Sequence, residues 1–467
     1  MTRAFDAFHL PGIDAADPAT LWAELAAGDV RLRHPILSAR QMHTLAAGLR
    51  ASRARVLERR PVRDIIRSID AATRLLAEAG ELRSLALDLL PHVTRMSPPM
   101  VELVLDRMAV DWRADALERL IAVEIGEPAA LDGFVEEPGA GRLVRALGPR
   151  IALNVFAGNV PGVAVTALVR CLLVKAAVIG KSAVDDPVLP VLFARALQRV
   201  DPELAECVAI TYWPGGRGEA EVAAIEEVDT IVVYGGAEAV RHVRESASAD
   251  TRILEHGPRM SLGFVARGAL RTETASELAR DIARAAATFD QHGCVSLHGA
   301  FIERGGAVEP RELARLIFRE LQALEDALPA GRLLAEEAAN LHAERARVEF
   351  NAMERGGELL AGPESFATVA YSEGPDAMPS CLDRFVRVSA IDDLLPAIEA
   401  LLPLAPMLQT AGLAAPAGIV TELAGALGRV GFTRVTSFAA MPWPLAHWHH
   451  DGASPLRELV RWVDLET

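Results

Sequence analysis

The chain has 467 residues, of which 51% are hydrophobic and 24% charged, and its net charge is −15. This length exceeds the roughly 250–300 residues at which a single hydrophobic core stops growing, so two or three domains are expected. The acidic charge argues against a nucleic-acid-binding surface and against attraction to anionic lipid.

The cysteine pattern and the first residues predict the cellular compartment of the protein. None of the four cysteines has C-x-x-C spacing, which disfavours a disulfide framework and a structural zinc site and fits a reducing compartment. The opening residues M-T-R-A-F-D-A-F-H-L-P-G contain no apolar stretch typical of a signal peptide. No apolar run reaches membrane-spanning length. We therefore expect a cytoplasmic protein without a membrane span.

Residues 18–125 have a helical pattern. Leu21, Trp22, Leu25 and Ala26 recur with a period near 3.6, as do later leucines and valines, and prolines interrupt the series. We predict a helical N-terminal region over residues 1–130 that packs on the cofactor domain. Its arginine-rich part, residues 50–67, is typical of a solvated helix face, although a docking surface for an acidic carrier protein is an alternative.

The next segment, residues 131–149, loosens into the turn E-E-P-G-A-G-R between short extended pieces. It predicts a strand pair and a candidate oligomerisation element. From Ile151 short apolar strands alternate with helices, which is typical of a parallel sheet covered on both faces. The expected strands are 151–156, 178–181, 207–212 and 230–234, and the expected helices are 163–176, 187–200, 219–225 and 237–246.

A second αβ unit is expected after Gly257. Its predicted elements are a strand at 261–266, a helix at 272–288, a strand at 299–303, two helical stretches to 350, strands at 368–371 and 385–388, and a helix at 392–402. We predict a cofactor domain over 150–257, a catalytic domain over 258–438 and a tail over 439–467.

Four βα turns of the first domain carry glycine, where helix N-termini favour phosphate. The turn P-G-G-R-G-E, with Gly215 and Gly216, is half of a dinucleotide fingerprint, because Glu221 replaces the third glycine. An ordinary βα turn explains this string equally well. Lys181, at a strand end, can reach a ribose hydroxyl or a phosphate.

Three further side chains can carry chemistry. Cys294, in F-D-Q-H-G-C-V-S-L-H-G-A, lies on a loop between a helix and a strand, where a thiolate can act as a nucleophile. Asn159, in A-G-N-V-P-G, can donate to an oxyanion, although an isolated Asn more often satisfies its own turn. Glu255 ends a strand and is either a solvated acid or a general base.

The order Asn159, Lys181, Gly235–Gly236, Glu255, Cys294 resembles the aldehyde dehydrogenase superfamily, on the strings A-G-N-V-P, G-K-S-A-V, V-Y-G-G-A-E and E-H-G-P-R. More narrowly, the D-Q-x-x-C-x-S loop, L-Q-T-A-G-L and the tail H-D-G-A-S-P-L-R-E-L look like the LuxC-type fatty-acyl reductases. This resemblance implies an α/β fold of two Rossmann-like domains with a helical N-terminal region and a small oligomerisation element.

The resemblance also implies roles for particular residues. Cys294 is the nucleophile, Asn159 contributes the oxyanion hole, and Glu255 matches the general base by position. The implied cofactor contacts are Lys181, Ser182, Gly215, Gly216, Gly235, Gly236 and Ala237. Val184 replaces the Glu that binds both ribose hydroxyls in NAD-preferring members, so we expect NADPH, with NADH permitted.

These expectations predict the reduction of an acyl thioester to the aldehyde, and the expected acyl group is a fatty acyl. The thioester is acyl-CoA or an acylated carrier or synthetase protein. An aldehyde oxidiser that uses Glu255 to activate water, and a non-redox cysteine acyltransferase, are the alternatives. By the same resemblance, residues 131–147 predict a homodimer or homotetramer.

The tail carries His447, His449, His450 and Asp451, which are residue types that bind metals. Their spacing differs from the helix-compatible HExxH pattern. We expect no metal site.

Overall fold

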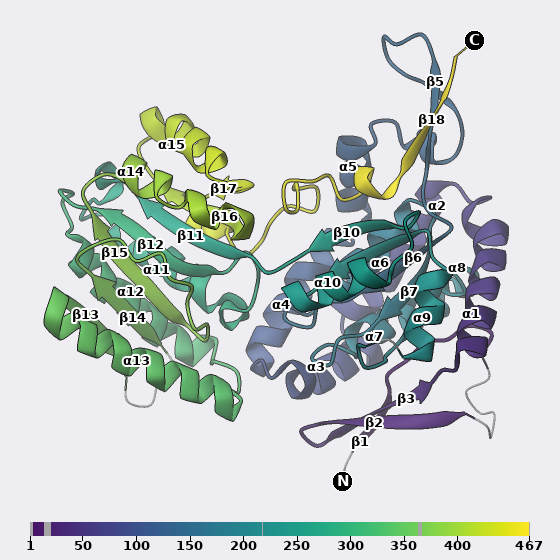
Figure 1. The fold of residues 1–467 in the computed structure, drawn as a ribbon, viewed down its shortest axis with the longest axis horizontal. Coiled ribbons are helices and arrows are strands. Elements are labelled where there is room, and N and C mark those ends of the chain that lie inside the picture. Colours follow the sequence, from purple (N-terminus) through teal and green to yellow (C-terminus); the bar gives the residue numbers. More distant parts are fainter. Residues whose placement is uncertain (1–2, 14–19, 217, 363–366, 467) are drawn as a thin grey trace. The chain divides into compact units, whose positions relative to one another are not determined.

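The computed structural model describes residues 3–13, 20–216, 218–362 and 367–466. Apolar strands alternating with helices build two compact units (Figure 1). Unit 1 comprises Met1–Thr94, Val101–Gly257 and Leu445–Thr467, and unit 2 comprises Arg95–Met100 and Pro258–Pro444. Each unit contains a parallel sheet, which confirms the predicted α/β class.

The sheet of unit 1 has five parallel strands in the order β10-β9-β6-β7-β8. The strands are β6 (Ile151–Val155), β7 (Ala177–Lys181), β8 (Val208–Thr211), β9 (Thr230–Tyr234) and β10 (Arg252–His256). Nearly every residue of β6 to β9 is buried, as expected for strands covered on both faces. The strands predicted from 151 to 234 are confirmed.

Helices cover both faces of this sheet. The helices of this part of the chain are α1 (Ala39–Ser52), α2 (Val62–Ala77), α3 (Glu81–Thr94), α4 (Pro98–Asp111), α5 (Ala114–Glu124), α6 (Val163–Leu173), α7 (Leu189–Val200), α8 (Pro202–Ala205), α9 (Glu219–Glu226) and α10 (Ala237–Ser246), and α2 packs on α6 and α7. On one face, Met42, Leu45 and Leu49 of α1 share a core with Ile151 and Ile179 of the sheet. The N-terminal region therefore contributes directly to the core of unit 1.

The helical periodicity predicted over Leu21–Ala26 is wrong. These residues belong to β2 (Leu21–Ala27), which pairs antiparallel with β3 (Val30–Ile36), and β1 (Arg3–Asp6) pairs parallel with β3. Gly28, with φ of 60°, and Asp29 form the two-residue turn between β2 and β3, a hairpin signal that outweighs a short apolar pattern. Residues 18 and 19 of the predicted helix lie outside the described residues.

The strand pair predicted in residues 131–149 is present as β4 (Val135–Glu136) and β5 (Leu143–Leu147). The tail adds β18 (Arg461–Leu465), which lies antiparallel beside β5 and completes a three-stranded sheet (Figure 1). Before this strand, the carboxylate of the buried Glu124 accepts the backbone N–H groups of Leu456 and Arg457. The tail from Leu445 onward is therefore part of unit 1.

The sheet of unit 2 has seven strands in the order β13-β14-β15-β12-β11-β16-β17, all parallel except β13. They are β11 (Met260–Val265), β12 (Leu297–Glu303), β13 (Gly357–Ala361), β14 (Thr368–Ser372), β15 (Phe385–Ile391), β16 (Leu408–Ala414) and β17 (Arg434–Thr436). The helices are α11 (Ala275–Ala287), α12 (Pro310–Ala327), α13 (Ala335–Arg355), α14 (Leu394–Glu399) and α15 (Ala417–Arg429). The predicted strands of this unit are confirmed.

Among the described residues, no helix is both long and apolar enough to cross a membrane.

Candidate active site

The turn after β6 carries Asn159, whose side chain is exposed. Gly162, with φ of 94°, ends this turn and begins α6, and the side chains of Met108 and Trp112 lie where a Cβ would project. The carboxyl of Asp186 accepts the N–H of Gly162 and of Leu189, so it ties the Asn159 turn to the loop after β7. Burial raises the pKa of Asp186 to about 7.

The end of β7 presents Lys181 and Ser182. Lys181 is one of only two lysines in the chain, and its Nζ lies 5.9 Å from the centre of the Tyr212 ring. Burial lowers the pKa of Lys181, while the Glu221 carboxylate raises it. Ser182 is fully buried, and its Oγ has no hydrogen-bond partner among the residues that the structure describes. A buried polar atom of this kind calls for an explanation, such as a ligand.

The glycine turn after β8 borders a groove of about 820 Å³. Gly215 and Gly216 line it together with Trp213, and the first turn of α1 forms another wall with Arg40. Open space surrounds the Cβ positions of both glycines, so their backbone can approach a ligand closely. Glu221 accepts the Gly216 N–H at 3.0 Å, which explains an acid in place of the third fingerprint glycine. Arg217 lies outside the described residues.

Gly235 and Gly236 follow β9, and Ala237 begins α10. The Gly235 N–H donates to the carbonyl of His256 on β10. Glu255 of β10 is bound by Arg244 of α10 through two hydrogen bonds and is 23% exposed. The structure thus brings Asn159, Lys181, Ser182, both glycine turns and Glu255 to the carboxyl ends of one parallel sheet, where ligands bind in such folds.

In unit 2, the loop before β12 carries Cys294 and begins with an unusual backbone. Phe289, Asp290 and Gln291 have φ values of 60°, 49° and 68°, and the facing residues 382–384 are also left-handed. A left-handed backbone costs roughly 1 kcal/mol for each residue other than glycine, so contacts with the surrounding residues must stabilise this conformation.

Two side chains enforce this backbone. The Gln291 amide donates to the carbonyls of Leu297 and Phe385 and accepts the Phe385 N–H at 2.7 Å. The Asp290 carboxylate binds Arg384, whose side chain is 0% exposed, at 2.8 Å. These bonds account for the D-Q pair in the D-Q-x-x-C-x-S string, because they fix the path of the chain into Cys294.

Cys294 itself is held at the amino ends of three strands. Its carbonyl accepts the Ser261 hydroxyl of β11 at 2.8 Å, and the same Oγ accepts the Thr410 N–H of β16 at 3.1 Å. The Nε2 of Gln409 lies 3.9 Å from the Cys294 sulfur. The sequence did not predict a role for Ser261 or Gln409, although Gln409 lies in the string L-Q-T-A-G-L that resembles the LuxC-type reductases.

The other three cysteines are poor nucleophiles. Burial raises the pKa of Cys171 to about 11, and those of Cys207 and Cys381 to about 12. They therefore remain protonated thiols near neutral pH.

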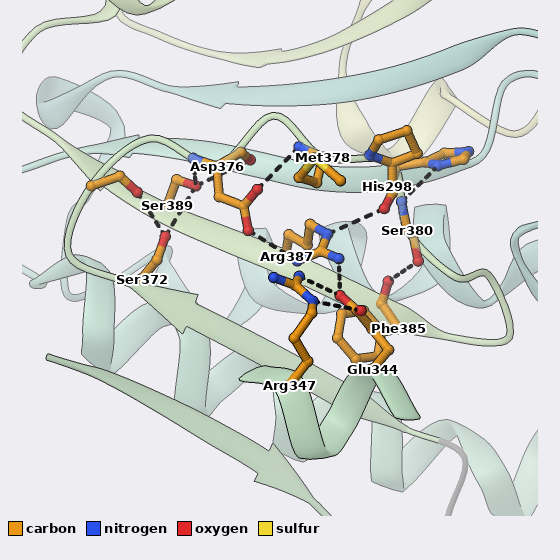
Figure 2. Close-up of polar contacts among 12 residues, drawn as sticks. His298, Glu344, Arg347, Ser372, Asp376, Met378, Ser380, Phe385, Arg387 and Ser389 are labelled. Atoms are coloured by element: carbon orange, nitrogen blue, oxygen red, sulfur yellow. Dashed lines mark hydrogen bonds and ion pairs between the residues drawn. The ribbon is translucent and has the colours of Figure 1, made fainter. Parts of the chain in front are cut away.

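A polar network covers the neighbouring strands β12 and β15 (Figure 2). Arg387 of β15 binds Glu344 of α13 and Asp376 of the preceding loop. The Ser380 N–H donates to Nδ1 of His298, and burial lowers the pKa of His298 to about 4, so this histidine is neutral at pH 7. The network fixes the loop over residues 376–384, which carries the left-handed turn facing Cys294's loop.

Of the histidines in the tail, His450 lies in a cluster with Asp451 and with His256 of β10. His256 Nδ1 lies 2.6 Å from Asp451 Oδ2, and His450 stacks on the His256 ring at 4.4 Å. Ligand atoms of these three residues lie within 4.8 Å of one another. Because stacked imidazole planes do not aim their lone pairs at one point, we interpret this cluster as a His256–Asp451 hydrogen bond within an aromatic stack. The expectation of no metal site stays a prediction.

The LuxC acyl-CoA reductase family model matches residues 57–462. The long-chain acyl-protein thioester reductase of Vibrio harveyi is 24% identical over 79% of this chain and 75% of its own length. An aldehyde dehydrogenase of Mycobacterium tuberculosis complexed with NAD+ superposes with a TM-score of 0.71, 15% identity, and coverage of 100% and 99% of the two chains. A glyceraldehyde-3-phosphate dehydrogenase of Methanocaldococcus jannaschii complexed with NADP gives 0.70, with 11% identity and coverage of 92% and 95%.

The matched range includes Asn159, Lys181, both glycine turns, Glu255 and Cys294, and the fold similarity extends over both units. The chain therefore has the aldehyde dehydrogenase fold and belongs to the LuxC family of acyl-CoA reductases.

Proposed function

We propose that this enzyme reduces an acyl thioester to the aldehyde with NADPH, through an S-acyl intermediate on Cys294. The observation that carries the proposal is the placement of Cys294. Its backbone is fixed by Ser261, its sulfur lies 3.9 Å from an amide nitrogen, and the other cysteines are poor nucleophiles. A named relative that acts on long-chain acyl-protein thioesters supports a fatty-acyl substrate carried by CoA or by a protein.

Unit 1 has features that suit a dinucleotide. The open Gly215–Gly216 turn lets the backbone approach a ligand closely, and Lys181 supplies a cation at the next strand end. The buried Ser182 hydroxyl adds a donor on the same edge of the sheet, and Gly236 and Ala237 begin α10 there. When bound, the cofactor supplies a hydride. Solved structures of this fold with NAD+ and with NADP support either dinucleotide, and Val184 favours NADPH.

The residues of the chain account for the remaining steps. The Cys294 thiolate attacks the thioester carbonyl, a new C–S bond forms, the C–S bond to the carrier breaks, and the carrier leaves as a thiolate that takes a proton from solvent. We assign stabilisation of the oxyanion to the Asn159 amide and the Cys294 backbone N–H. Hydride addition to the acyl carbon gives a thiohemiacetal on Cys294. Its collapse breaks the C–S bond and releases the aldehyde and the thiolate.

Glu255 distinguishes this reaction from aldehyde oxidation. An oxidising enzyme needs a base to activate the water that hydrolyses the acyl-enzyme, whereas a thioester reductase does not. Arg244 binds both carboxylate oxygens of Glu255, which favours a supporting role for this residue.

The test is acyl-enzyme labelling with radioactive long-chain acyl-CoA, followed by NADPH oxidation. Cys294→Ala is expected to abolish both the label and turnover, while the matched variant Cys381→Ala keeps both. Full turnover by Cys294→Ala would refute the proposal. Failure of the wild type to bind NADPH in calorimetry would instead favour the non-redox acyltransferase.

A further inference from the structure

Two side chains next to Cys294 have no part in the mechanism above. Gln409 is 0% exposed, and its Nε2 faces the sulfur at 3.9 Å. Arg434 begins β17 and lies directly beside Thr410 of β16 in the parallel register. Both side chains therefore come from the same edge of the sheet as Cys294.

The Gln409 side chain is enclosed by its surroundings. Its backbone carbonyl accepts the N–H of Thr433 at 3.0 Å, and its side-chain Oε1 is buried without a hydrogen-bond partner among the described residues. A buried amide group with an oxygen that accepts no hydrogen bond calls for an explanation. An amide N–H directed at sulfur is a weak interaction with a thiol and a much stronger one with a thiolate.

Arg434 supplies a positive charge. Its guanidinium donates to the carbonyls of Ala440 at 2.6 Å and Met441 at 2.8 Å, which fixes the charge without neutralising it. Burial lowers the pKa of Arg434 to about 10, and the charge of the Cys294 sulfur acts in the opposite direction. The two groups are thus within electrostatic reach, and Arg434 stays protonated at neutral pH.

The other charged side chains on the Cys294 loop and just before β11 have hydrogen-bond partners of their own. On Cys294's own loop, Asp290 is bound by Arg384, and His292 lies 2.9 Å from Asp383. Arg259, just before β11, donates to the carbonyl of Pro406.

We propose that Gln409 and Arg434 form a thiolate-binding site that keeps Cys294 ionised before the acyl thioester arrives. Arg434 stabilises the anion through its charge, and Gln409 does so through an N–H···S hydrogen bond. The proposal rests on Cys294 being the nucleophile, and both side chains are positioning residues that act through it. The same pair stabilises the departing thiolate when the thiohemiacetal releases the aldehyde, so it assists the last step as well as the first.

The experiment measures alkylation of Cys294 by iodoacetamide as a function of pH, without substrate or cofactor, by mass spectrometry of the Cys294 peptide. Thiolate absorbance gives a second readout. Because the pKa values of the other cysteines are about 11 to 12, a step below about pH 9 belongs to Cys294. Arg434→Gln keeps a donor for the Ala440 and Met441 carbonyls but removes the charge.

We expect Arg434→Gln to move the alkylation midpoint up by about one pH unit and to slow alkylation at neutral pH about tenfold. Arg434→Lys should restore most of the rate, Gln409→Leu should slow it about twofold to fivefold, and the exposed control Arg429→Gln should leave it unchanged. Thermal melting of each variant shows whether it is folded. If Arg434→Gln does not fold, the pH midpoint of Cys294 alkylation in Gln409→Leu tests the proposal.

An unchanged midpoint in a folded Arg434→Gln protein would overturn this inference and leave the proposed function intact. Acyl labelling and turnover by Cys294→Ala would instead overturn the proposed function. The two failures are therefore distinguishable.

Discussion

The two parallel sheets of the molecule carry their candidate residues at opposite strand ends. In unit 1, Asn159, Lys181 and the glycine turns follow β6, β7, β8 and β9, at the carboxyl ends. In unit 2, Ser261, Cys294, Gln409 and Arg434 lie where β11, β12, β16 and β17 begin. The proposed cofactor contacts of unit 1 follow the rule that ligands bind at the carboxyl ends of parallel strands, whereas the residues around Cys294 lie at the opposite ends of their strands.

This contrast predicts that the two ends can be perturbed separately. The largest effect is expected for Asn159→Ala, which should reduce kcat about 100- to 1,000-fold because it removes an oxyanion donor. Alkylation of Cys294 forms no oxyanion and should be unchanged. Steady-state kinetics and peptide mass spectrometry measure the two quantities. The exposed Asn340→Ala is the control, and near-normal kcat in Asn159→Ala would exclude the assigned role.

The left-handed turns of unit 2 depend on a buried ion pair. Arg384→Met should lower the free energy of unfolding of unit 2 by about 3–5 kcal/mol, because it leaves Asp290 buried without its partner. Amide hydrogen exchange should accelerate in β12 and β15 and stay constant in β6 and β7. Arg315→Met, which removes an exposed pair with Glu358, should cost no more than about 1 kcal/mol. Equal effects of both variants would contradict this account.

Lys181→Met tests the cofactor end. We expect NADPH binding to weaken about tenfold, which corresponds to about 1.4 kcal/mol, because a cation at the strand end is lost. Calorimetry measures this change, and Lys181→Arg should retain most of the affinity. A changed alkylation profile of Cys294 in Lys181→Met would show that the two strand ends are coupled.

Asp186 gives unit 1 a pH dependence. Burial raises its pKa to about 7, so its contribution to stability is complete below its ordinary pKa near 4 and is lost as the pH rises through about 7. Asp186→Asn cannot ionise. Between about pH 5 and about pH 8.5 the wild-type Tm should therefore fall by about 2–4 °C more than that of the variant, as measured by calorimetry. Parallel pH profiles would remove Asp186 as the source.

The smallest effect is expected for Glu255→Gln. Because a thioester reductase needs no base for deacylation, its reduction rate should stay within about threefold of the wild type. Arg244→Met, which leaves the carboxylate in place, is the matched control. A loss of about 100-fold or more in Glu255→Gln alone would make Glu255 a catalytic base and revive the oxidising alternative.

Sequence reasoning succeeded where a pattern has one physical cause. The apolar strands β6 to β9 are buried on both faces, so their composition reveals them, and the glycine turns follow from strand-to-helix geometry. The largely exposed strand β2 has no such pattern, and the Gly28–Asp29 turn after it is the better signal. Cys294 was placed on its loop, but β12 begins at Leu297, two residues earlier than expected. Gln409 and Arg434 are distant in sequence from Cys294, and only the pairing of β16 with β17 and the fold around them bring them together.

The division of the chain into units has a consequence for how the protein is made. Unit 1 contains residues 445–467, which close the three-stranded sheet and bond to the buried Glu124. As the polypeptide leaves the ribosome, unit 1 is thus begun first and finished last, after unit 2, which carries Cys294, has emerged. Removing residues 445–467 should therefore destabilise the N-terminal part of the protein. Chaperones should bind the nascent N-terminal half until β18 has been synthesised.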